Sequence, residues 1–248
     1  MATRSFGLIL HIFVAQSLAS AGVIGSESPD VQGISVDLTD QKSLPADVNL
    51  RRDPVQGTIQ SLKGRNLSVE LEQDDFFRAL QSANRFAEIA LAFLNTYRSE
   101  FKLQHPADEL LVESVVVDDL GFKQVRLQQV FEGIPIWGEQ IIVQMDRSNH
   151  VNLVHGRYVP TPAGISTVPK ISKEEALRTV TASLDRLEHD CPNCRSEIIL
   201  FALENKPPRL AYRILAPISL AEGWAVTVDA VTGAILNRVP TVYNQTAN

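Results

Sequence analysis

The chain has 248 residues, of which 44% are hydrophobic and 21% are charged. This is an ordinary globular composition, long enough for one large domain or two small ones, and it excludes a chain that is disordered throughout. The formal net charge of −6 argues against a nucleic-acid partner. Binding phosphates needs a dense cationic patch, and the short clusters Arg51-Arg52 and Lys63-Gly64-Arg65 are not dense.

The N-terminus has the pattern of an export signal. Arg4 precedes an apolar run from Phe6 to Ala15, and Ala19-Ser20-Ala21 is a small-x-small cleavage site. We therefore expect residues 1–21 to be a signal peptide and the chain to be secreted, either extracellular or periplasmic. The run is short for a bilayer span, which disfavours a retained anchor, and we expect no membrane partner after its removal. Removal would change the formal charge from −6 to −7, because Arg4 is the one charged residue lost.

The next part of the chain combines an irregular segment with a strongly periodic one. Residues 22–56 are polar and interrupted by prolines, so we expect a flexible lead-in. One or two short strands are expected between Gly57 and Leu71. From Asp74 to Glu100 apolar residues recur in alternating steps of four and three, which predicts one long helix. The residues of this stripe are Phe76, Leu80, Ala83, Ala87, Ala90, Leu94 and Tyr97.

An antiparallel meander of four strands is expected to follow and to pack against this helix. We expect Val125, Leu127 and Phe131 to share one face, and Arg126 and Gln128 to point the other way. The reversal between the second and third strands is expected at Gly133 and Pro135. The four strands are predicted at Leu111–Val117, Lys123–Phe131, Ile136–Met145 and Val151–Val159.

A second unit is expected after a proline-rich hinge at 161–170. Ser172-Lys173-Glu174-Glu175 has the sequence of a capping box and predicts the start of a helix. The apolar stripe of that helix is Leu177, Val180, Leu184 and Leu187, and strands are predicted at Glu197–Leu203, Leu210–Leu215, Gly223–Asp229 and Ala234–Val239. The order of helix then strands thus occurs twice. This predicts an α+β fold of two units, each one long helix packed on an antiparallel β-sheet.

Two residues separate Cys191 from Cys194, a spacing used by local disulfides, by redox pairs and by half of a zinc site. The chain has no second cysteine pair to complete a zinc site. A redox pair is disfavoured because the motif follows a helix instead of lying within a βαβ unit. In an exported chain, a disulfide that closes a loop is the favoured reading.

Sequence motifs of catalysis are missing. We find no nucleophile elbow, phosphate loop, zinc-protease helix or dinucleotide fingerprint. The histidines are scattered, and His150 and His155 are five residues apart, which places them on opposite faces of a strand. We therefore expect no catalytic, cofactor-binding or metal-ligating residue, and no enzymatic activity of the chain itself.

Residues 118–138 read DDLGFKQVRLQQVFEGIPIWG. This stretch resembles the propeptide signature shared by fungalysin and thermolysin-type zinc metallopeptidases: a Leu-Gly turn, an Arg-Leu-Gln-Gln strand, an aromatic residue, Gly-Ile-Pro, and a second aromatic residue followed by Gly. Val154–Pro160 resembles the end of the same module, and Arg98–Phe101 its beginning. The candidates for the motif and the partner surface are Arg126, Gln128, Gln129, Phe131, Gly133, Pro135, Trp137 and Gly138.

The C-terminal part is similar to the PepSY module that follows this propeptide in such precursors. The similarity rests on Ile171–Ala176 and on the strand, turn and strand between Trp224 and Leu236. The resemblance implies a fungalysin/thermolysin propeptide (FTP) domain at 57–160 and a PepSY-like domain at 171–239, with 240–248 as a linker or processing segment. It also implies cystatin-like and PepSY-like versions of the helix-on-sheet unit.

In the family, the propeptide guides folding of the catalytic domain, occludes its zinc cleft and is removed by cleavage. These 248 residues contain no H-E-x-x-H motif, so the resemblance implies a secreted regulator, an intramolecular chaperone or inhibitor, that binds a thermolysin-like metallopeptidase catalytic domain. Zinc, and calcium where such enzymes hold it, would belong to that partner, and we expect no cofactor in this chain. Two alternatives remain: a non-catalytic secreted or cell-envelope binding module, and a truncated precursor of a secreted metalloendopeptidase.

Overall fold

A computed structural model places residues 42–184, 191–202, 206–219 and 222–241, all within one compact unit at Thr39–Asn248. The expected signal peptide at 1–21, most of the lead-in, Leu187 and residues 242–248 lie outside the described residues. None of the helices in the described ranges is both long and apolar enough to cross a membrane.

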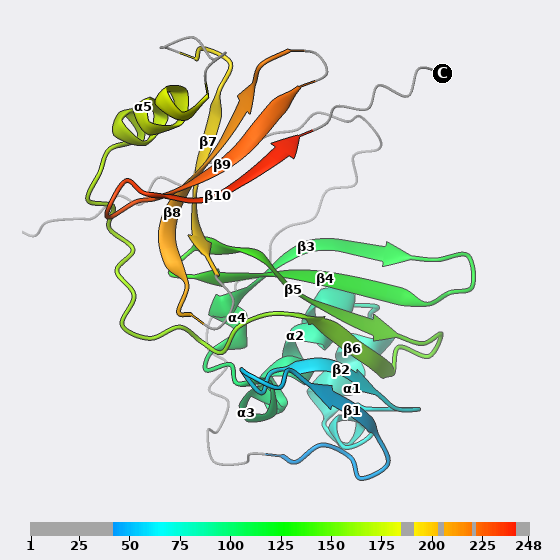
Figure 1. Cartoon of the computed structure of the whole chain (residues 1–248). Helices are drawn as coiled ribbons and strands as arrows, with labels where there is room; N and C mark the ends of the chain where they lie inside the picture. Colours follow the sequence, from blue (N-terminus) through cyan, green and yellow to red (C-terminus); the bar gives the residue numbers. More distant parts are fainter. Residues whose placement is uncertain (1–41, 185–190, 203–205, 220–221, 242–248) are drawn as a thin grey trace, which may run out of the picture. The chain divides into compact units, whose positions relative to one another are not determined.

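Two groups of elements follow each other along the chain (Figure 1). The first group comprises β1 (Asn49–Arg52), β2 (Ile59–Lys63), the 3-10 helix η1 (Leu71–Gln73), α1 (Asp75–Ser82), α2 (Phe86–Thr96), α3 (Arg98–Phe101), α4 (Pro106–Glu109), β3 (Leu110–Val117), β4 (Lys123–Phe131), β5 (Ile134–Met145) and β6 (Val151–Arg157). The second group comprises α5 (Lys173–Ser183), β7 (Arg195–Phe201), β8 (Arg209–Pro217), β9 (Gly223–Asp229) and β10 (Ile235–Thr241).

The predicted four-strand meander is confirmed. Strands β3 to β6 pair antiparallel, each with the next, and β4 has the predicted bounds. The sheet continues from β6 to β2 and from β2 to β1. Strand β1 was not predicted and lies inside the expected lead-in, where Asn49 pairs with Lys63 of β2. Backbone pairing therefore orders this part of a segment whose own sequence has no strand pattern.

The prediction of one long helix at 74–100 is wrong, because the chain forms α1, α2 and α3 there. After α1 the backbone turns through Asn84, which takes the left-handed conformation that asparagine tolerates (φ +54°). The side-chain amide of Asn149 holds this break by donating to the Gln81 carbonyl oxygen at 2.8 Å and to Asn84 Oδ1 at 3.0 Å. The apolar spacing continues across the break, so the sequence pattern does not reveal it. Phe76, expected on the buried stripe, is exposed, and Phe77 is buried instead.

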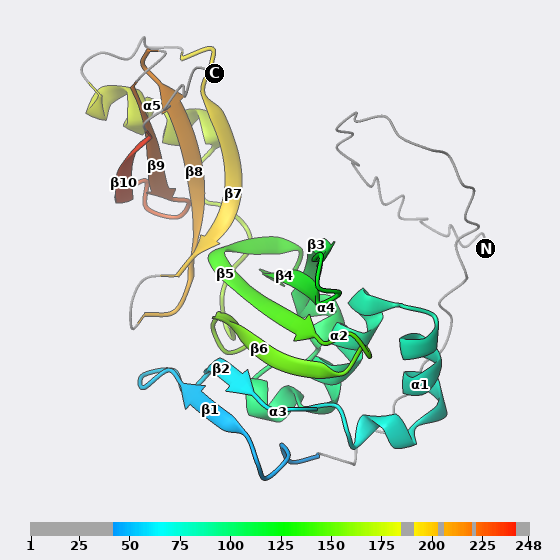
Figure 2. The same ribbon diagram turned by 90° about the vertical axis from the view of Figure 1, so that its right-hand side faces the viewer.

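The helices of the first group cover one face of the meander, as Figure 2 shows for α1 and α2 beside β5 and β6. Strand β4 contributes Val125 and Leu127 to the shared core, as expected. The helices contribute an aromatic stack in which the Phe93 ring lies 4.9 Å from that of Tyr97 and 6.2 Å from that of Phe101. Burial of these large rings contributes strongly to the stability of this part of the fold.

In the second group, α5 packs on β8 and β9 (Figure 1). The capping box predicted at the start of α5 is confirmed: Ser172 Oγ accepts from the Glu175 backbone N–H at 3.1 Å, and Glu175 Oε2 accepts from the Ser172 N–H at 2.7 Å. Ala176 and Val180 then face the core of this group. The four predicted strands form the antiparallel series β7, β8, β9 and β10.

The two groups of strands join in one continuous sheet. Ile136 in β5 pairs in parallel with Leu200 in β7, which gives the strand order β1-β2-β6-β5-β7-β8-β9-β10, with β4 and β3 branching from β5. The α+β class is therefore confirmed. The arrangement of two units with one long helix each is not confirmed, because the first helix is divided and the strands of both groups belong to the same sheet.

We expect the substitution Ser172→Ala to lower the free energy of unfolding by about 1 kcal/mol, because it removes the acceptor for the Glu175 N–H at the start of α5. Urea unfolding followed by circular dichroism measures this change. Ser172→Asp, which keeps an N-cap acceptor, is the control and should retain most of the stability. An unchanged midpoint for Ser172→Ala would contradict the assigned role of the cap.

Candidate interaction surface

The hairpin between β4 and β5 turns on two residues, Glu132 and Gly133. Both have positive φ, +49° and +78°, the combination that a two-residue hairpin turn of the type I′ class needs. Gly133 is thus in the reversal, as predicted. Pro135 is not, because it lies within β5 opposite Val130. In a two-residue hairpin the pair next to the turn, Phe131 and Ile134, is the hydrogen-bonded one, so Pro135 needs no N–H donor toward β4.

A bulge in β5 follows immediately. Gln128 lies opposite Gln140 while Val130 lies opposite Pro135, so residues 136–139 have no regular partners in β4. We call these four residues the β5 bulge. Within it Gly138 takes φ +77°, where a side chain would be strained. The side-chain amide of Gln128 donates to the carbonyl oxygens of Ile136 at 2.8 Å and Glu139 at 3.0 Å. Gln128 therefore replaces hydrogen bonds that the ladder loses.

Gln129 is fully buried and works as a clamp. Its Nε2 donates to the Val159 carbonyl oxygen at 2.8 Å, and its Oε1 accepts from the Val159 N–H at 3.0 Å. Both backbone groups of Val159 are thus satisfied by one side chain, which fixes the chain where it leaves β6 for the hinge. Gln129 is a structural residue, not part of a surface.

Phe131 and Trp137 face the second group of strands. Phe131 packs against a small core that includes Ile136, Leu200 and Leu210. It does not join Val125 and Leu127 in the helix-facing core, so the predicted common face is wrong for Phe131. The bulge accounts for this difference, since it redirects the hairpin end toward β7 and β8.

The Trp137 ring, 41% exposed, is covered by the Arg213 guanidinium of β8 at 3.8 Å from the ring centroid. Arg213 Nη1 also donates to Glu197 Oε1 in β7 at 2.8 Å. A cation over an aromatic face in this geometry is attractive. Trp137 therefore ties the bulge to β8, a contact that sequence analysis missed because Arg213 is remote in the chain and its own strand gives no sign of it.

The sheet face away from the helices carries a row of side chains that we call the outer row: Ser61, Ser114, Arg126, Ile142 and His155. The register places them side by side on neighbouring strands. Arg126 Nη1 donates to Gln140 Oε1 at 2.8 Å, and Gln140 Nε2 donates to Glu113 Oε2 at 3.0 Å. Arg126 is thus the predicted candidate that lies in the outer row, held in place by its neighbours.

Two ionisable groups near the outer row have shifted pKa values. The pKa of His155 is lowered because partial burial disfavours its charged form and because Arg126 repels a second positive charge. The pKa of Glu139 is raised by burial, an effect that Arg157 opposes through an ion pair at 3.0 Å. Burial is the larger cause of both shifts.

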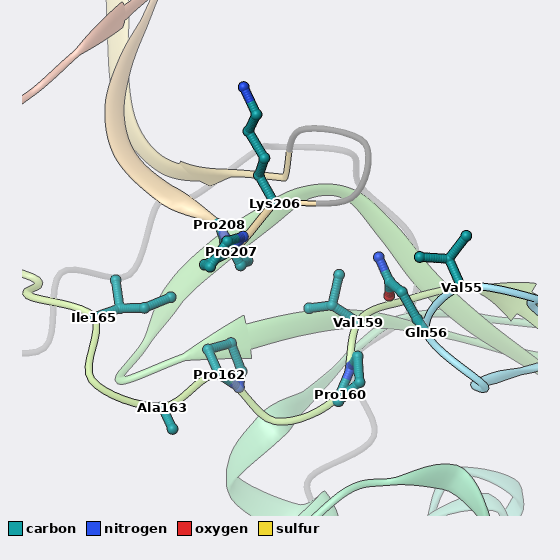
Figure 3. A pocket seen from close by; sticks show the side chains of 10 residues that line it. All are labelled: Val55, Gln56, Val159, Pro160, Pro162, Ala163, Ile165, Lys206, Pro207 and Pro208. Atoms are coloured by element: carbon teal, nitrogen blue, oxygen red, sulfur yellow. The ribbon is translucent and has the colours of Figure 1, made fainter.

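A shallow cavity of about 330 Å³ lies beside the hinge (Figure 3). Its walls are Val55, Gln56, Val159, Pro160, Pro162, Ala163, Ile165, Lys206, Pro207 and Pro208. Figure 3 shows the Lys206 ammonium directed away from the proline rings. The lining is mostly apolar and offers no acid, base or nucleophile set, and it contains none of the predicted motif residues.

The described residues contain no group of three or more His, Cys, Asp or Glu side chains placed to hold a metal ion. His150 interacts with Asp146 at 3.2 Å and Glu72 at 3.5 Å, which fixes the turn before β6. Cys191 and Cys194 form a disulfide in the loop before β7, and Cys191 is buried.

The sequence between α4 and the end of β6 matches a known family. Residues 108–158 match the fungalysin/thermolysin propeptide motif. This range covers β3 to β6 and therefore the whole hairpin, its bulge and the outer-row residues of β3 to β6.

Three curated relatives are named bacillolysin, neutral protease B and thermolysin. Bacillolysin of Bacillus subtilis (strain 168) is 32% identical over 142 residues, 54% of this chain and 27% of the relative. Neutral protease B of the same strain is 26% identical over 157 residues, 60% of this chain and 29% of the relative. Thermolysin of Alicyclobacillus acidocaldarius is 25% identical over 166 residues, 61% of this chain and 29% of the relative. The chain thus spans less than a third of the length of these relatives.

Among solved structures, the Bacillus megaterium YpeB C-terminal domain aligns with a TM-score of 0.34 and 17% identity, over 63% of this chain and 64% of that chain. The comparisons support the FTP resemblance at 108–158. The PepSY resemblance at 171–239 stays a prediction.

We expect a double-mutant cycle between Trp137→Ala and Arg213→Gln to give a coupling energy of about 0.5–2 kcal/mol, measured by urea unfolding, because the two side chains stack. The pair Trp224 and Arg238, stacked at 4.2 Å within the second group, is a matched control that should couple without affecting the hairpin. If the effects of the Trp137 and Arg213 substitutions on the free energy of unfolding were additive, the two side chains would not interact as proposed.

We expect the protein to lose stability as the pH falls below about 6.5, and the variant His155→Gln to lose less. The folded pKa of His155 is below its unfolded value, so the unfolded state takes up the proton first and acid favours unfolding. Urea midpoints at about pH 7 and about pH 5 measure the difference. Equal losses in both proteins would show that His155 does not contribute.

Proposed function

We propose that this chain is a propeptide-type regulator that binds the catalytic domain of a thermolysin-like zinc metallopeptidase. The observation that carries the proposal is the FTP motif at 108–158, supported by similarity to bacillolysin and thermolysin. The regulator acts by binding and has no catalytic residue of its own. It holds such an enzyme inactive, assists the folding of its catalytic domain, or does both.

A binding role fits the chemistry of the described residues. A protease of this class keeps one zinc position open for substrate and water, and a folded module that fills the cleft denies both. A folding helper must instead bind the near-native catalytic domain better than the unfolded one, which shifts the folding equilibrium by mass action. Both actions need a shaped surface held rigidly. Zinc, and calcium if present, would be ligands of the partner.

We propose the outer row, with Arg126 at its centre, as the surface that contacts the protease. This face of the sheet is not covered by α1 to α4, which lie on the opposite side. Arg126 is oriented by Gln140, and Gln140 by Glu113, so its guanidinium is available in one arrangement for a carboxylate or carbonyl of the partner. Preorganised polar groups of this kind give specificity with little ordering cost.

The remaining parts of the chain have supporting roles in this proposal. Residues 1–21 direct export, residues 171–239 form a PepSY-like domain that completes the regulator, and residues 240–248 lead toward the partner. The continuous sheet through β5 and β7 supports the coupling of the FTP and PepSY-like parts, because a partner bound to one would be held in a fixed relation to the other.

We expect the purified protein to inhibit bacillolysin or thermolysin, and Arg126→Ala to raise the inhibition constant about tenfold or more, as loss of a central arginine anchor does in other interfaces. Initial rates of peptide hydrolysis at increasing concentrations of the protein measure the constant. A second assay follows recovery of activity when the denatured catalytic domain refolds with and without the protein. Together the assays separate inhibition from folding assistance.

Arg78→Ala, in α1 on the helix side of the sheet, is the matched control and should leave inhibition unchanged. Unfolding curves show that both variants are folded before they are compared. Absence of inhibition, of refolding assistance and of binding to either enzyme at about 100 µM would refute the proposed function, since an interface of normal size binds well below that concentration.

A further inference from the structure

Strand β3 forms a free edge of the sheet within the described part of the chain. It pairs with β4 on one side, and no described strand lies on its other side. Apart from Leu110, which is buried, its apolar side chains are 42–56% exposed. They are Leu111, Val112, Val115, Val116 and Val117. Val112 lies opposite Leu127 on the helix side, while Val116 lies opposite Gln124 on the outer side, so β3 is apolar and exposed on both faces.

The other two edges of the same sheet look different. Edge strand β1 carries Arg51 and Arg52, and edge strand β10 carries Arg238 and Pro240. Charges and proline on an edge strand are the usual means by which proteins prevent pairing with another chain. In β3 the single charge is Glu113, whose carboxylate accepts from Gln140 of its own sheet. A bulge between Val112 and Ser114 bends the strand, yet both flanks of the bulge stay apolar.

A strand that pairs with this edge must have side chains suited to those of β3. It must be extended, have a free edge of its own and carry apolar side chains on both faces, because it would contact Val112 on one side and Val116 on the other. Among the described strands, β3 itself meets all three conditions. In an antiparallel pair of β3 strands centred on Val115, the two Val115 side chains lie opposite each other on the helix side, Val116 of each copy lies opposite Ser114 of the other on the outer side, and Glu113 lies near Val117. No like charges face each other in this register.

We propose that two copies of this chain pair through β3, antiparallel about a twofold axis, so that the sheet continues from one copy into the other. The backbone groups on the free edge supply hydrogen bonds, and the valines of both copies become buried. This pairing does not depend on the proposed regulation of a protease. It leaves the helix layer of each copy in place.

Sedimentation equilibrium of the full-length protein between about 1 and 100 µM tests the proposal, because a dimer with micromolar affinity is populated across this range. The mass should rise from one 27.4 kDa chain toward two. Val116→Lys should weaken the dimer about 30-fold or more, since the symmetric contact loses an apolar residue and gains a buried charge in both copies. Val116 is 56% exposed in the monomer, so a lysine there is solvated and the chain still folds.

Val55→Lys is the control, because Val55 is 64% exposed and lies in the turn between β1 and β2. It should dimerise like the wild type. Hydrogen exchange adds a local readout: the amides of 111–117 should exchange more slowly as the protein concentration rises, and the amides of β1 should not change. A wild type that stays monomeric up to about 100 µM would overturn the proposal. A Val116→Lys variant that dimerises as tightly as Val55→Lys would also overturn it.

The same variants separate this proposal from the proposed function. If the wild type is monomeric and Val116→Lys inhibits a metallopeptidase less well than Val55→Lys does, the β3 edge belongs to the protease interface and the pairing of two copies is refuted. If the wild type dimerises through β3 and inhibits no protease, the pairing stands and the proposed function fails.

Discussion

Strand β5 bends at residues 136–139, where four residues leave the ladder with β4. Neighbouring groups offset the cost of the lost hydrogen bonds. Gln128 supplies hydrogen bonds to two of the freed carbonyl groups, Gly138 accepts a backbone conformation that a larger residue would resist, and Arg213 covers Trp137. As a result the first part of β5 pairs with β7 and the rest with β6. One strand therefore serves both groups of the sheet.

Because of this arrangement, most residues of the hairpin motif have a structural role within the protein. Gln128, Gln129, Trp137 and Gly138 form the connection within the protein, and of the motif residues Arg126 is the one that lies in the outer row. A motif match thus does not identify the residues that touch a partner. The order of its residues is explained largely by the hydrogen bonds and positive φ angles that a bulged, shared strand requires.

The sequence predicted strands such as β4 and the start of α5, because the signals for them are local. These signals are the alternation of apolar and polar residues over Lys123–Phe131 and the capping box at Ser172. The break at Asn84 was not predictable in this way, since it depends on Asn149, which is distant in sequence. The clamp of Gln129 on Val159 and the stacking of Arg213 on Trp137 are also long-range contacts between residues with no local pattern. Side-chain hydrogen bonds and edge exposure likewise depend on which strands become neighbours.

The small core around Ile136 limits how the protein can be divided. Ile136 comes from β5 and Val159 from the segment after β6, while Leu200 and Leu210 come from β7 and β8 and Ala230 from the turn after β9. A fragment cut at residue 160 would leave these apolar side chains in water on both pieces and expose the edge of β5 that β7 now occupies. Although a sequence motif defines residues 108–158 as a recognisable segment, the packed core around Ile136 extends beyond the motif into the second group of strands.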